Sequence, residues 1–318
     1  MFYVAHRLFA AHDRVLGAHI AARLASETGT GSVFLPFCDT GEDTLASDCK
    51  GRLLFDLDCA RLRRITGMIA VLHGPSLDDG VCMEIGFAAA RGIPVILVST
   101  DFQTYALADC GPQCTFPDPL LEHLATSVIR AHRLGPFRGH AHGGRFRAFL
   151  EQNLATVQAA ADQAVAELLT TAGVHAPERH SAMILPHLAY IEPSPYFPDP
   201  MWEAVHAELH ARGWQVHTAR RFQDRADPVA AAGEDWTAVT AASLAIIDVR
   251  GPETPPGAAL ITGARAVAGK RVLAAWSGSW HTLADGREPN WRNLMIQYAL
   301  TARFTSIRDL VRALESLP

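Results

Sequence analysis

Short apolar runs alternate with segments of helical periodicity along this chain, and this alternation is what most constrains its fold. In the first hundred residues the apolar runs that we interpret as strands are Phe2–Ala5, Ser32–Phe37, Met68–Leu72 and Val95–Ser99. The helical patterns between them are Asp13–Leu24, a segment ending at Leu62–Ile65, and Val81–Arg91. Strands separated by helices with short connections predict a parallel sheet covered on both faces. We therefore expect an α/β fold of the doubly wound, Rossmann or flavodoxin-like type.

The same order of elements returns in the second half of the chain. Strand material is expected at Ala182–Leu185, Leu188–Ile191, Leu244–Asp248 and Arg271–Trp276, and helices at Met201–Arg212 and Ala258–Ala268. A shift of 177 residues aligns Asp58 with Asp235, Gly80 with Gly257, and Gly86 with Gly263. Because strands, glycine turns and helices all coincide, the pattern predicts a tandem duplication of one α/β domain.

Between the two halves lies a segment of different character. Residues Leu134–Arg145 are rich in Gly and His and indicate a loop, whereas Phe146–Thr171 has the pattern of one long helix. The sequence thus predicts a first domain over 1–135, a linker with a long helix over 136–178, and a second domain over 179–318. We expect the long helix to tie the halves together and to help bury their interface.

Composition excludes several classes of protein. Hydrophobic residues make up 49% of the 318, which excludes wholesale disorder, and the net charge of −5 argues against a basic nucleic-acid binder. No run of about 18 apolar residues and no basic leader is present, so we expect a cytoplasmic protein that does not enter a membrane. The six cysteines are unevenly spaced and indicate reduced thiols. Cys110 with Cys114, or His140 with His142, make only a weak metal motif, and we predict no metal.

The segment Asp78–Ala88 carries the strongest chemical signal. It follows the apolar run Met68–Leu72, and ligands of doubly wound sheets bind outside the carboxyl ends of strands. Glu84 is then expected in the first turns of a helix, where a carboxylate is favoured as the anion by about 0.3–1 kcal/mol. That state suits a nucleophile. The alternative is that Asp79 caps the helix and Glu84 is an ordinary surface charge.

Two further residues strengthen the functional interpretation. Asp58 precedes the same strand, at a place where it is either a helix cap or a ligand of substrate. Tyr3 on the first strand is expected to project toward the same crevice, and its alternative is a core aromatic whose hydroxyl is hydrogen-bonded.

With these residues in place, the first half resembles the nucleoside 2-deoxyribosyltransferase family, over roughly 2–99. The residues that carry the resemblance are Tyr3, Phe9 and Asp13-Arg14; Asp58 eight residues before Thr66; and the motif Asp78-x-Gly80-x-x-Met83-Glu84-Ile85-Gly86-Phe87-Ala88. Thr66 and His73 depart from it, since family members often have Asp at both places. The resemblance implies a doubly wound domain in which Glu84 is the nucleophile and Tyr3 orients it. It also implies that Asp78 and Asp58 contact base and sugar beside Gly80 and Met83.

The chemistry that the resemblance implies is transfer of a nucleoside's sugar with retention of configuration. Glu84 attacks the anomeric carbon, the base leaves with a proton from Asp78, and a second base or water attacks the covalent intermediate. Two carboxylates in different environments can divide the roles of nucleophile and acid. The partners implied are a small nucleoside and a free nucleobase, without a metal or organic cofactor.

The second half departs from this pattern. Its aligned positions hold Pro255 in place of Asp78 and Ile261 in place of Glu84, so we expect it to be catalytically inactive. It does contain Asn293-Leu294-Met295, and the family carries an Asn-Leu-Met motif that reaches into the neighbouring subunit's active site. We therefore expect Asn293 and Met295 to bind substrate in one composite site per chain, formed by a monomeric pseudo-dimer or a homodimer. Asn293 is equally expected to cap a helix.

Three functions remain open from the sequence. The first is a deoxyribosyltransferase, which fits the intact set of acids. The second is an N-glycoside hydrolase acting on a nucleoside or a nucleotide. Related hydrolases of monophosphates resemble one another in a Gly-Ser-Ile-Arg loop after the first strand, where this chain has Ala5-His6-Arg7-Leu8 and no Ser. The third is a protein that binds nucleosides without catalysis, which the second half would allow.

Overall fold

The computed structural model describes residues 1–41, 45, 49–131, 144–172, 183–196, 198–278, 281–283 and 287–317. The boundaries expected at 135, 136, 178 and 179 lie outside these residues, as do His140 and His142. Two five-stranded parallel sheets with helices between their strands follow one another along the chain, which confirms the expected fold class.

The first domain is built around one parallel sheet. Its elements are β1 (Phe2–Ala5), α1 (Ala11–Thr28), β2 (Val33–Phe34), α2 (Lys50–Leu62), β3 (Gly67–Val71), α3 (Asp79–Ala90), β4 (Val95–Ser99), α4 (Pro119–Leu124), β5 (Ser127–Arg130) and α5 (Arg145–Thr171). The strand order is β2-β1-β3-β4-β5, which is the flavodoxin-like order. Strands β3 and β4 are buried along their whole length, as expected for apolar runs covered by helices on both faces.

The second domain repeats this topology. Its elements are β6 (Leu185–Glu192), α6 (Met201–Ala211), β7 (Gln215–Thr218), α7 (Pro228–Ala241), β8 (Ala242–Asp248), α8 (Pro256–Val267), β9 (Arg271–Ala275), α9 (Leu294–Ala299), β10 (Ala302–Phe304) and α10 (Ile307–Glu315). Read from the other edge, its strand order β10-β9-β8-β6-β7 is the order of the first sheet. The fold therefore occurs twice, and descent of the two domains by duplication stays a prediction.

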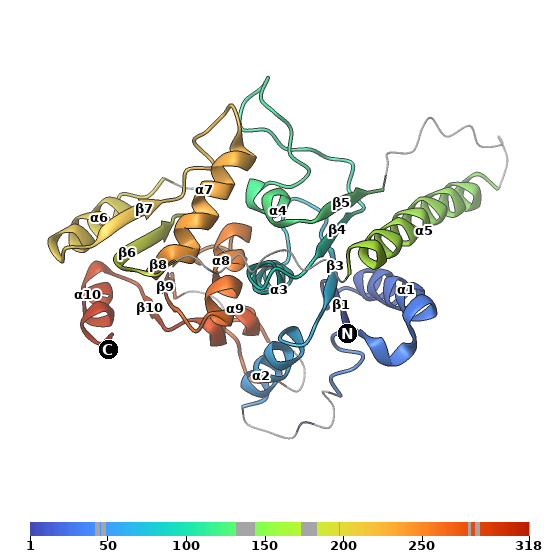
Figure 1. Ribbon diagram of the computed structural model, residues 1–318, viewed down its shortest axis with the longest axis horizontal. Helices are drawn as coiled ribbons and strands as arrows, with labels where there is room; N and C mark the ends of the chain where they lie inside the picture. The colour runs from blue at the N-terminus through green and yellow to red at the C-terminus, as the bar shows by residue number, and fades with distance from the viewer. Residues whose placement is uncertain are drawn as a thin grey trace.

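Helices α3 and α8 lie between the two sheets and make the central contact of the molecule (Figure 1). All twelve residues of α3 are buried, in agreement with a helix whose only charged residues are Asp79 and Glu84. The two helices cross at glycines. A Cβ on Gly86 would lie 1.9 Å from the Leu260 carbonyl oxygen, and one on Gly263 would lie 1.9 Å from that of Met83. Only glycine allows this approach, and one hydrophobic core runs continuously across both domains.

The long helix has a different place from the one expected. Helix α5 packs on α1 and on strands of the first sheet, so it covers the outer face of the first domain (Figure 1). Its buried residues, Ala160, Ala161, Ala164, Val165 and Leu168, share one hydrophobic cluster with that sheet. The expectation that it buries the interface between the halves is therefore wrong; α3 and α8 do so.

Two expected strands differ in extent. The strand expected over Ser32–Phe37 is limited to β2, because Pro36 has no N–H to donate and the N–H of Leu35 donates to the Asp39 carboxylate at 2.8 Å. The material expected as two pieces around Leu185 and Leu188 forms one strand, β6, interrupted by a register shift where His187 adopts a positive φ of 63°.

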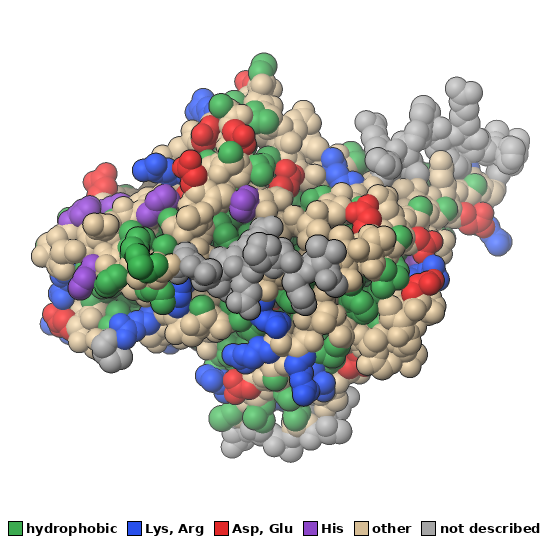
Figure 2. Space-filling model, in the orientation of Figure 1, with side chains coloured by type: hydrophobic (Ala, Val, Ile, Leu, Met, Phe, Trp, Pro, Cys, Tyr) green, Lys and Arg blue, Asp and Glu red, His purple; other side chains and the backbone are tan. Residues whose placement is uncertain are grey.

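The surface carries charges of both signs. Figure 2 shows acidic and basic side chains scattered over the face turned to the viewer, with Lys and Arg near α2 at its lower end. Among the described helices, not one combines the length and apolar character needed to cross a bilayer.

Candidate active site between the two domains

A cavity of about 650 Å³ opens between the domains, at the carboxyl ends of β1 and β3. The first domain lines it with the loop after β1, one side of α2 and the first turns of α3, and the second domain lines it with the residues around 252 and those leading into α9. The sequence-predicted residues that line it are Asp58, Asp78, Gly80, Glu84, Asn293 and Met295. A cavity lined by both halves, as the prediction of a composite site requires, is therefore present in one chain.

Glu84 and Tyr3 form the innermost part of the site. The Tyr3 hydroxyl donates a hydrogen bond of 2.7 Å to Oε1 of Glu84, and Glu84 is only 7% exposed. Glu84 is thus not a surface charge. Burial, reinforced by the negative charge of Asp58, raises the pKa of Glu84 well above its ordinary value, and the bond from Tyr3 works in the opposite direction. The stabilisation of ionised Glu84 that was expected from the helix N-terminus is therefore outweighed by burial.

Asp78 caps helix α3, the role that sequence reasoning had given to Asp79. Its Oδ1 accepts a hydrogen bond of 2.9 Å from the N–H of Val81. Its Oδ2 lies 3.6 Å from Nε of Arg7. Burial raises the pKa of Asp78 in spite of these contacts, so this carboxyl can carry a proton near neutral pH more readily than an exposed one.

Asp79 faces the second domain. Its Oδ2 accepts a hydrogen bond of 3.3 Å from the N–H of Thr254. Burial and the charge of Asp78 raise the pKa of Asp79 to about 7. The sequence indicates Asp79 only as a possible helix cap. Its contact with Thr254 could not be predicted, because the two residues are far apart along the chain.

Asp58 lies inside α2 rather than before it. The alternative that it caps a helix is therefore wrong, because α2 begins at Lys50. From one turn before the end of the helix Asp58 reaches the cavity, where its charge raises the pKa of Glu84. Two acids thus act on each other across the floor of the site.

Asn293 caps a helix, as one expectation has it, and it lines the cavity, whereas its binding of substrate stays a prediction. It caps α9, because its Oδ1 accepts a hydrogen bond of 3.0 Å from the N–H of Met295. Its Nδ2 lies 2.7 Å from the place of a Cβ on Gly80, so a side chain at Gly80 would displace the Asn293 amide. Met295 is buried and also lines the cavity.

Met83 does not reach the cavity wall. It is fully buried, and its carbonyl oxygen is the group that Gly263 of α8 approaches. The expectation that Met83 binds substrate therefore has no support from its position.

Among the lining residues that the sequence did not predict are two charged ones, Glu253 and Arg292. Glu253 lies 3.5 Å from Nη2 of Arg7 and accepts a bond of 2.7 Å from the Ser76 hydroxyl. Arg292 is buried, and its guanidinium donates to the carbonyl oxygens of Val249 and Gly251, which fixes the segment before α9. Neither belongs to a motif; the position of Arg292 directly before Asn293 was the one available signal.

The corresponding place in the second domain is filled by protein. The strand register puts Tyr190 where Tyr3 stands, since Tyr3 pairs with Met68 and Tyr190 with Ala245. Its hydroxyl donates to Glu192 at 2.9 Å, on the same strand. The N-cap of α4, Asp118, takes the place that Asn293 has at the N-cap of α9.

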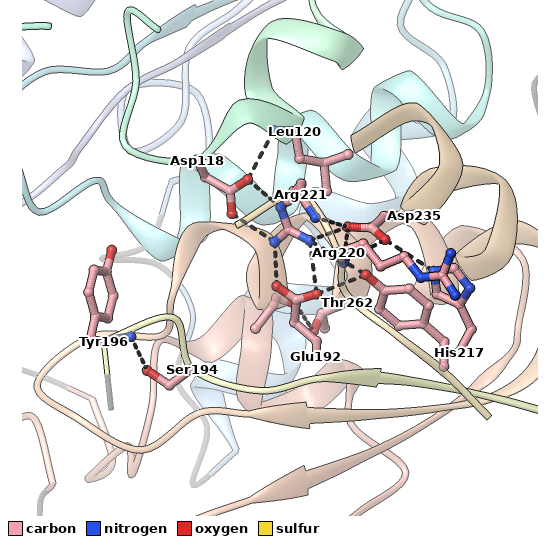
Figure 3. A network of polar contacts seen from close by, with 12 residues as sticks. Asp118, Leu120, Glu192, Ser194, Tyr196, His217, Arg220, Arg221, Asp235 and Thr262 are labelled. Carbon is pink, nitrogen blue, oxygen red and sulfur yellow. Dashed lines mark hydrogen bonds and ion pairs between the residues drawn. The ribbon is translucent and has the colours of Figure 1, made fainter. Parts of the chain in front are cut away.

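Arg221 occupies the centre of this second place, surrounded by three carboxylates (Figure 3). Its Nε and Nη2 donate to Asp118 of the first domain at 2.7 and 2.9 Å, and it also donates to Glu192 and Asp235. A Cβ on Gly257 would lie 2.0 Å from its Nη2. The guanidinium is fully buried, so it fills the space that corresponds to the cavity of the first domain.

Comparison with known proteins supports the resemblance for the first domain. Residues 2–135 match the family described as nucleoside 2-deoxyribosyltransferase, and the match does not extend into the second domain. Among solved structures, the chain is similar to a conserved protein from Enterococcus faecalis V583, at 30% identity and a TM-score of 0.27. That likeness covers 32% of this chain and 64% of the other, less than two thirds of its length. No curated protein matches the chain.

Proposed function

We propose that the chain is a nucleoside 2-deoxyribosyltransferase with one composite active site, in which Glu84 is the nucleophile. The observation that carries the proposal is the bond of 2.7 Å from Tyr3 to Glu84, at the floor of a cavity that Asp58 and Asp78 also line. The match of residues 2–135 to this family supports the class of reaction.

In the first half of the proposed reaction, a Glu84 oxygen forms a bond to the anomeric carbon of the nucleoside sugar. The bond from that carbon to the base nitrogen breaks, and its electron pair goes to the base, which takes a proton from Asp78. The Tyr3 hydroxyl donates a hydrogen bond to Oε1 of Glu84 and so holds the carboxylate in a fixed orientation. Positive charge developing on the sugar favours the ionised form of Glu84 at this step.

In the second half, the nitrogen of an acceptor base attacks the anomeric carbon and the bond to Glu84 breaks. The acceptor's proton passes to Asp78, which restores both carboxyls to their starting states. Two displacements at one carbon leave its configuration retained. Hydrolysis is the same sequence with water as the acceptor.

Arg7 favours a nucleoside over a nucleoside monophosphate as the substrate. Its guanidinium lies 3.6 Å from Asp78 and 3.5 Å from Glu253, and Nη2 also donates to the Ser76 carbonyl oxygen at 2.9 Å. A phosphate brought to Arg7 would compete with the Glu253 carboxylate for its charge, and like charges at this range repel.

Incubation with deoxyinosine, with and without adenine, followed by chromatography tests the proposal. We expect deoxyadenosine when adenine is present and little free hypoxanthine without it. Glu84→Gln should abolish the formation of deoxyadenosine and of free hypoxanthine. Glu203→Gln, on the exposed face of α6, should leave the formation of both unchanged. If free hypoxanthine forms without an acceptor, the activity is hydrolysis and not transfer. If deoxyinosine binds saturably but no product forms, the chain is a nucleoside-binding protein.

A further inference from the structure

We propose that the first domain binds one divalent transition-metal ion through His12, Asp13 and His73. His12 and Asp13 lie in the first turn of α1, and His73 lies just beyond β3. These three residues form a cluster, and none of them lines the active cavity. The proposal does not depend on the proposed reaction.

The three side chains offer ligand atoms at the spacing that a metal requires. Nε2 of His73 lies 2.9 Å from Oδ1 of Asp13, and Nε2 of His12 lies 3.5 Å from the same oxygen. One ligand atom from each residue lies within 4.8 Å of the others. Ligands held about 2.0–2.2 Å from a zinc-like ion are separated by somewhat less than this limit. The His12 side chain is 79% exposed, so it can turn toward an ion freely.

Asp13 supplies the second, independent observation. Its side chain is only 2% exposed, and its Oδ2 is buried without a hydrogen-bond partner among the described residues. An unpartnered buried carboxylate oxygen is costly, because the interior does not replace the water that it loses. A cation held by both oxygens of the Asp13 carboxylate would satisfy Oδ2 as well.

His73 is already oriented as a metal ligand would be. Its Nδ1 faces the Thr100 hydroxyl at 3.4 Å, while Nε2 faces Asp13. In metal sites the second ring nitrogen of a ligating His is characteristically held by a polar neighbour, which fixes the ring and its tautomer. The Thr100 hydroxyl can take that part here.

Two imidazole nitrogens with one carboxylate favour an ion of the Zn²⁺ or Co²⁺ type over Mg²⁺ or Ca²⁺, which prefer oxygen ligands. Three protein ligands leave one position for water on the exposed His12 side. The ion would join the start of α1 to the end of β3. Arg14 on the same helix turn donates to the carbonyl oxygens of Leu8 and Phe9, at 2.7 and 3.0 Å, and both residues line the active cavity. The ion would thus stiffen one cavity wall.

Titration of the full-length chain, without an affinity tag and stripped with chelator, tests the site with Co²⁺ as the probe. We expect one equivalent to produce visible d–d bands without a thiolate charge-transfer band, and Zn²⁺ to displace it and raise the Tm. His12→Ala and His73→Ala should each weaken binding by at least about 10-fold. Because His12 is exposed, its variant should keep the Tm of the metal-free protein.

Matched controls separate this cluster from other histidines. His19→Ala changes a residue of the same helix outside the cluster, and the double variant His140→Ala with His142→Ala removes the pair in the central Gly/His-rich segment. Both should bind Co²⁺ as the wild type does. The absence of d–d bands, bands that survive in both His12→Ala and His73→Ala, or bands lost in the double variant would overturn the proposal. None of these readouts depends on transferase activity.

Discussion

The hydroxyl of Tyr3 stands 2.7 Å from Oε1 of Glu84, and this bond joins the first strand of the sheet to the central helix. Both side chains are buried, so their bond is not weakened by competition with water. Burial raises the pKa of Glu84 while the bond from Tyr3 opposes that rise, so the bond bears directly on when the proposed nucleophile is ionised.

Glu84→Gln should remove activity and stabilise the fold at neutral pH. Because burial raises the folded-state pKa of Glu84, folding favours the protonated form. The resulting stability is complete below the ordinary pKa of Glu and is lost as the pH rises through the raised folded value. Glutamine cannot ionise, so the variant should have the higher Tm at pH 7 and an unchanged Tm in acid. Thermal melts across pH test this, and residual turnover above about a tenth of wild type would contradict the nucleophile assignment.

Tyr3→Phe should move the acid side of the pH–rate profile to higher pH. The Tyr3 bond lowers the pKa of Glu84, so its loss lets burial raise that pKa further. Since the reaction needs ionised Glu84, kcat/KM should begin to fall at a higher pH than in the wild type. Tyr190→Phe removes the equivalent bond, to Glu192, and is the matched control. If the pH–rate profile of Tyr3→Phe is not shifted, the hydrogen bond from Tyr3 does not control the pKa of Glu84.

Asp78→Asn should slow poor leaving groups more than good ones. An amide still accepts the N–H of Val81 and keeps the helix cap, but it cannot deliver a proton to the departing base. Turnover of deoxyinosine should fall, while an activated nitrophenyl deoxyriboside should be spared. Parallel losses on both substrates would remove Asp78 from the acid role. Asp227→Asn, at the N-cap of α7, controls for a change of cap alone.

Asn293→Asp and Asn293→Ala should separate capping from substrate binding. Aspartate keeps the oxygen that accepts the N–H of Met295, but it replaces the amide nitrogen beside Gly80. Both variants should weaken nucleoside binding by about 1–3 kcal/mol, as for a lost buried hydrogen bond, and only the alanine should also lose helix stability. Calorimetric titration and thermal melts measure the two effects. Full affinity in the aspartate variant would confine Asn293 to its capping role.

Arg221→Met should destabilise the chain by about 3–5 kcal/mol, because it leaves three buried carboxylates without their cation. Burial raises the pKa of Glu192, so the loss should shrink in acid, where Glu192 protonates, and pH-dependent denaturant melts would reveal it. An exposed ion pair gives the control: Arg147→Met, which removes the pair with Glu151, should change little. Equal and small effects in both variants would contradict this account.

Ile261→Glu should not create a second active site while Arg221 stays in place.

The order of strands and helices could be predicted from the sequence because each apolar run is bounded by its own turn residues. That Asp78, Glu84 and Asn293 line one cavity could be predicted from two motifs, the segment Asp78–Ala88 and Asn293-Leu294-Met295. The burial of Glu84 did not, because whether a helical carboxylate faces solvent or protein depends on contacts made elsewhere in the chain. The same holds for Arg221, whose partners Asp118 and Glu192 are 103 and 29 residues away. The stripe of small residues on α5 did carry a signal for its docking on the first sheet, which the expectation about the interface overlooked.

The complete burial of α3 has a consequence for how the chain is synthesised. Its outward face is covered by α8, and the two helices are 177 residues apart along the chain. During translation the first domain therefore emerges with one apolar face of α3 uncovered, and it stays so until the second domain leaves the ribosome. Nascent chains that expose such surfaces are prone to aggregate, which makes them natural clients of chaperones. The second domain thus covers the apolar face of the first. It is synthesised later, but every chain contains one copy of each domain.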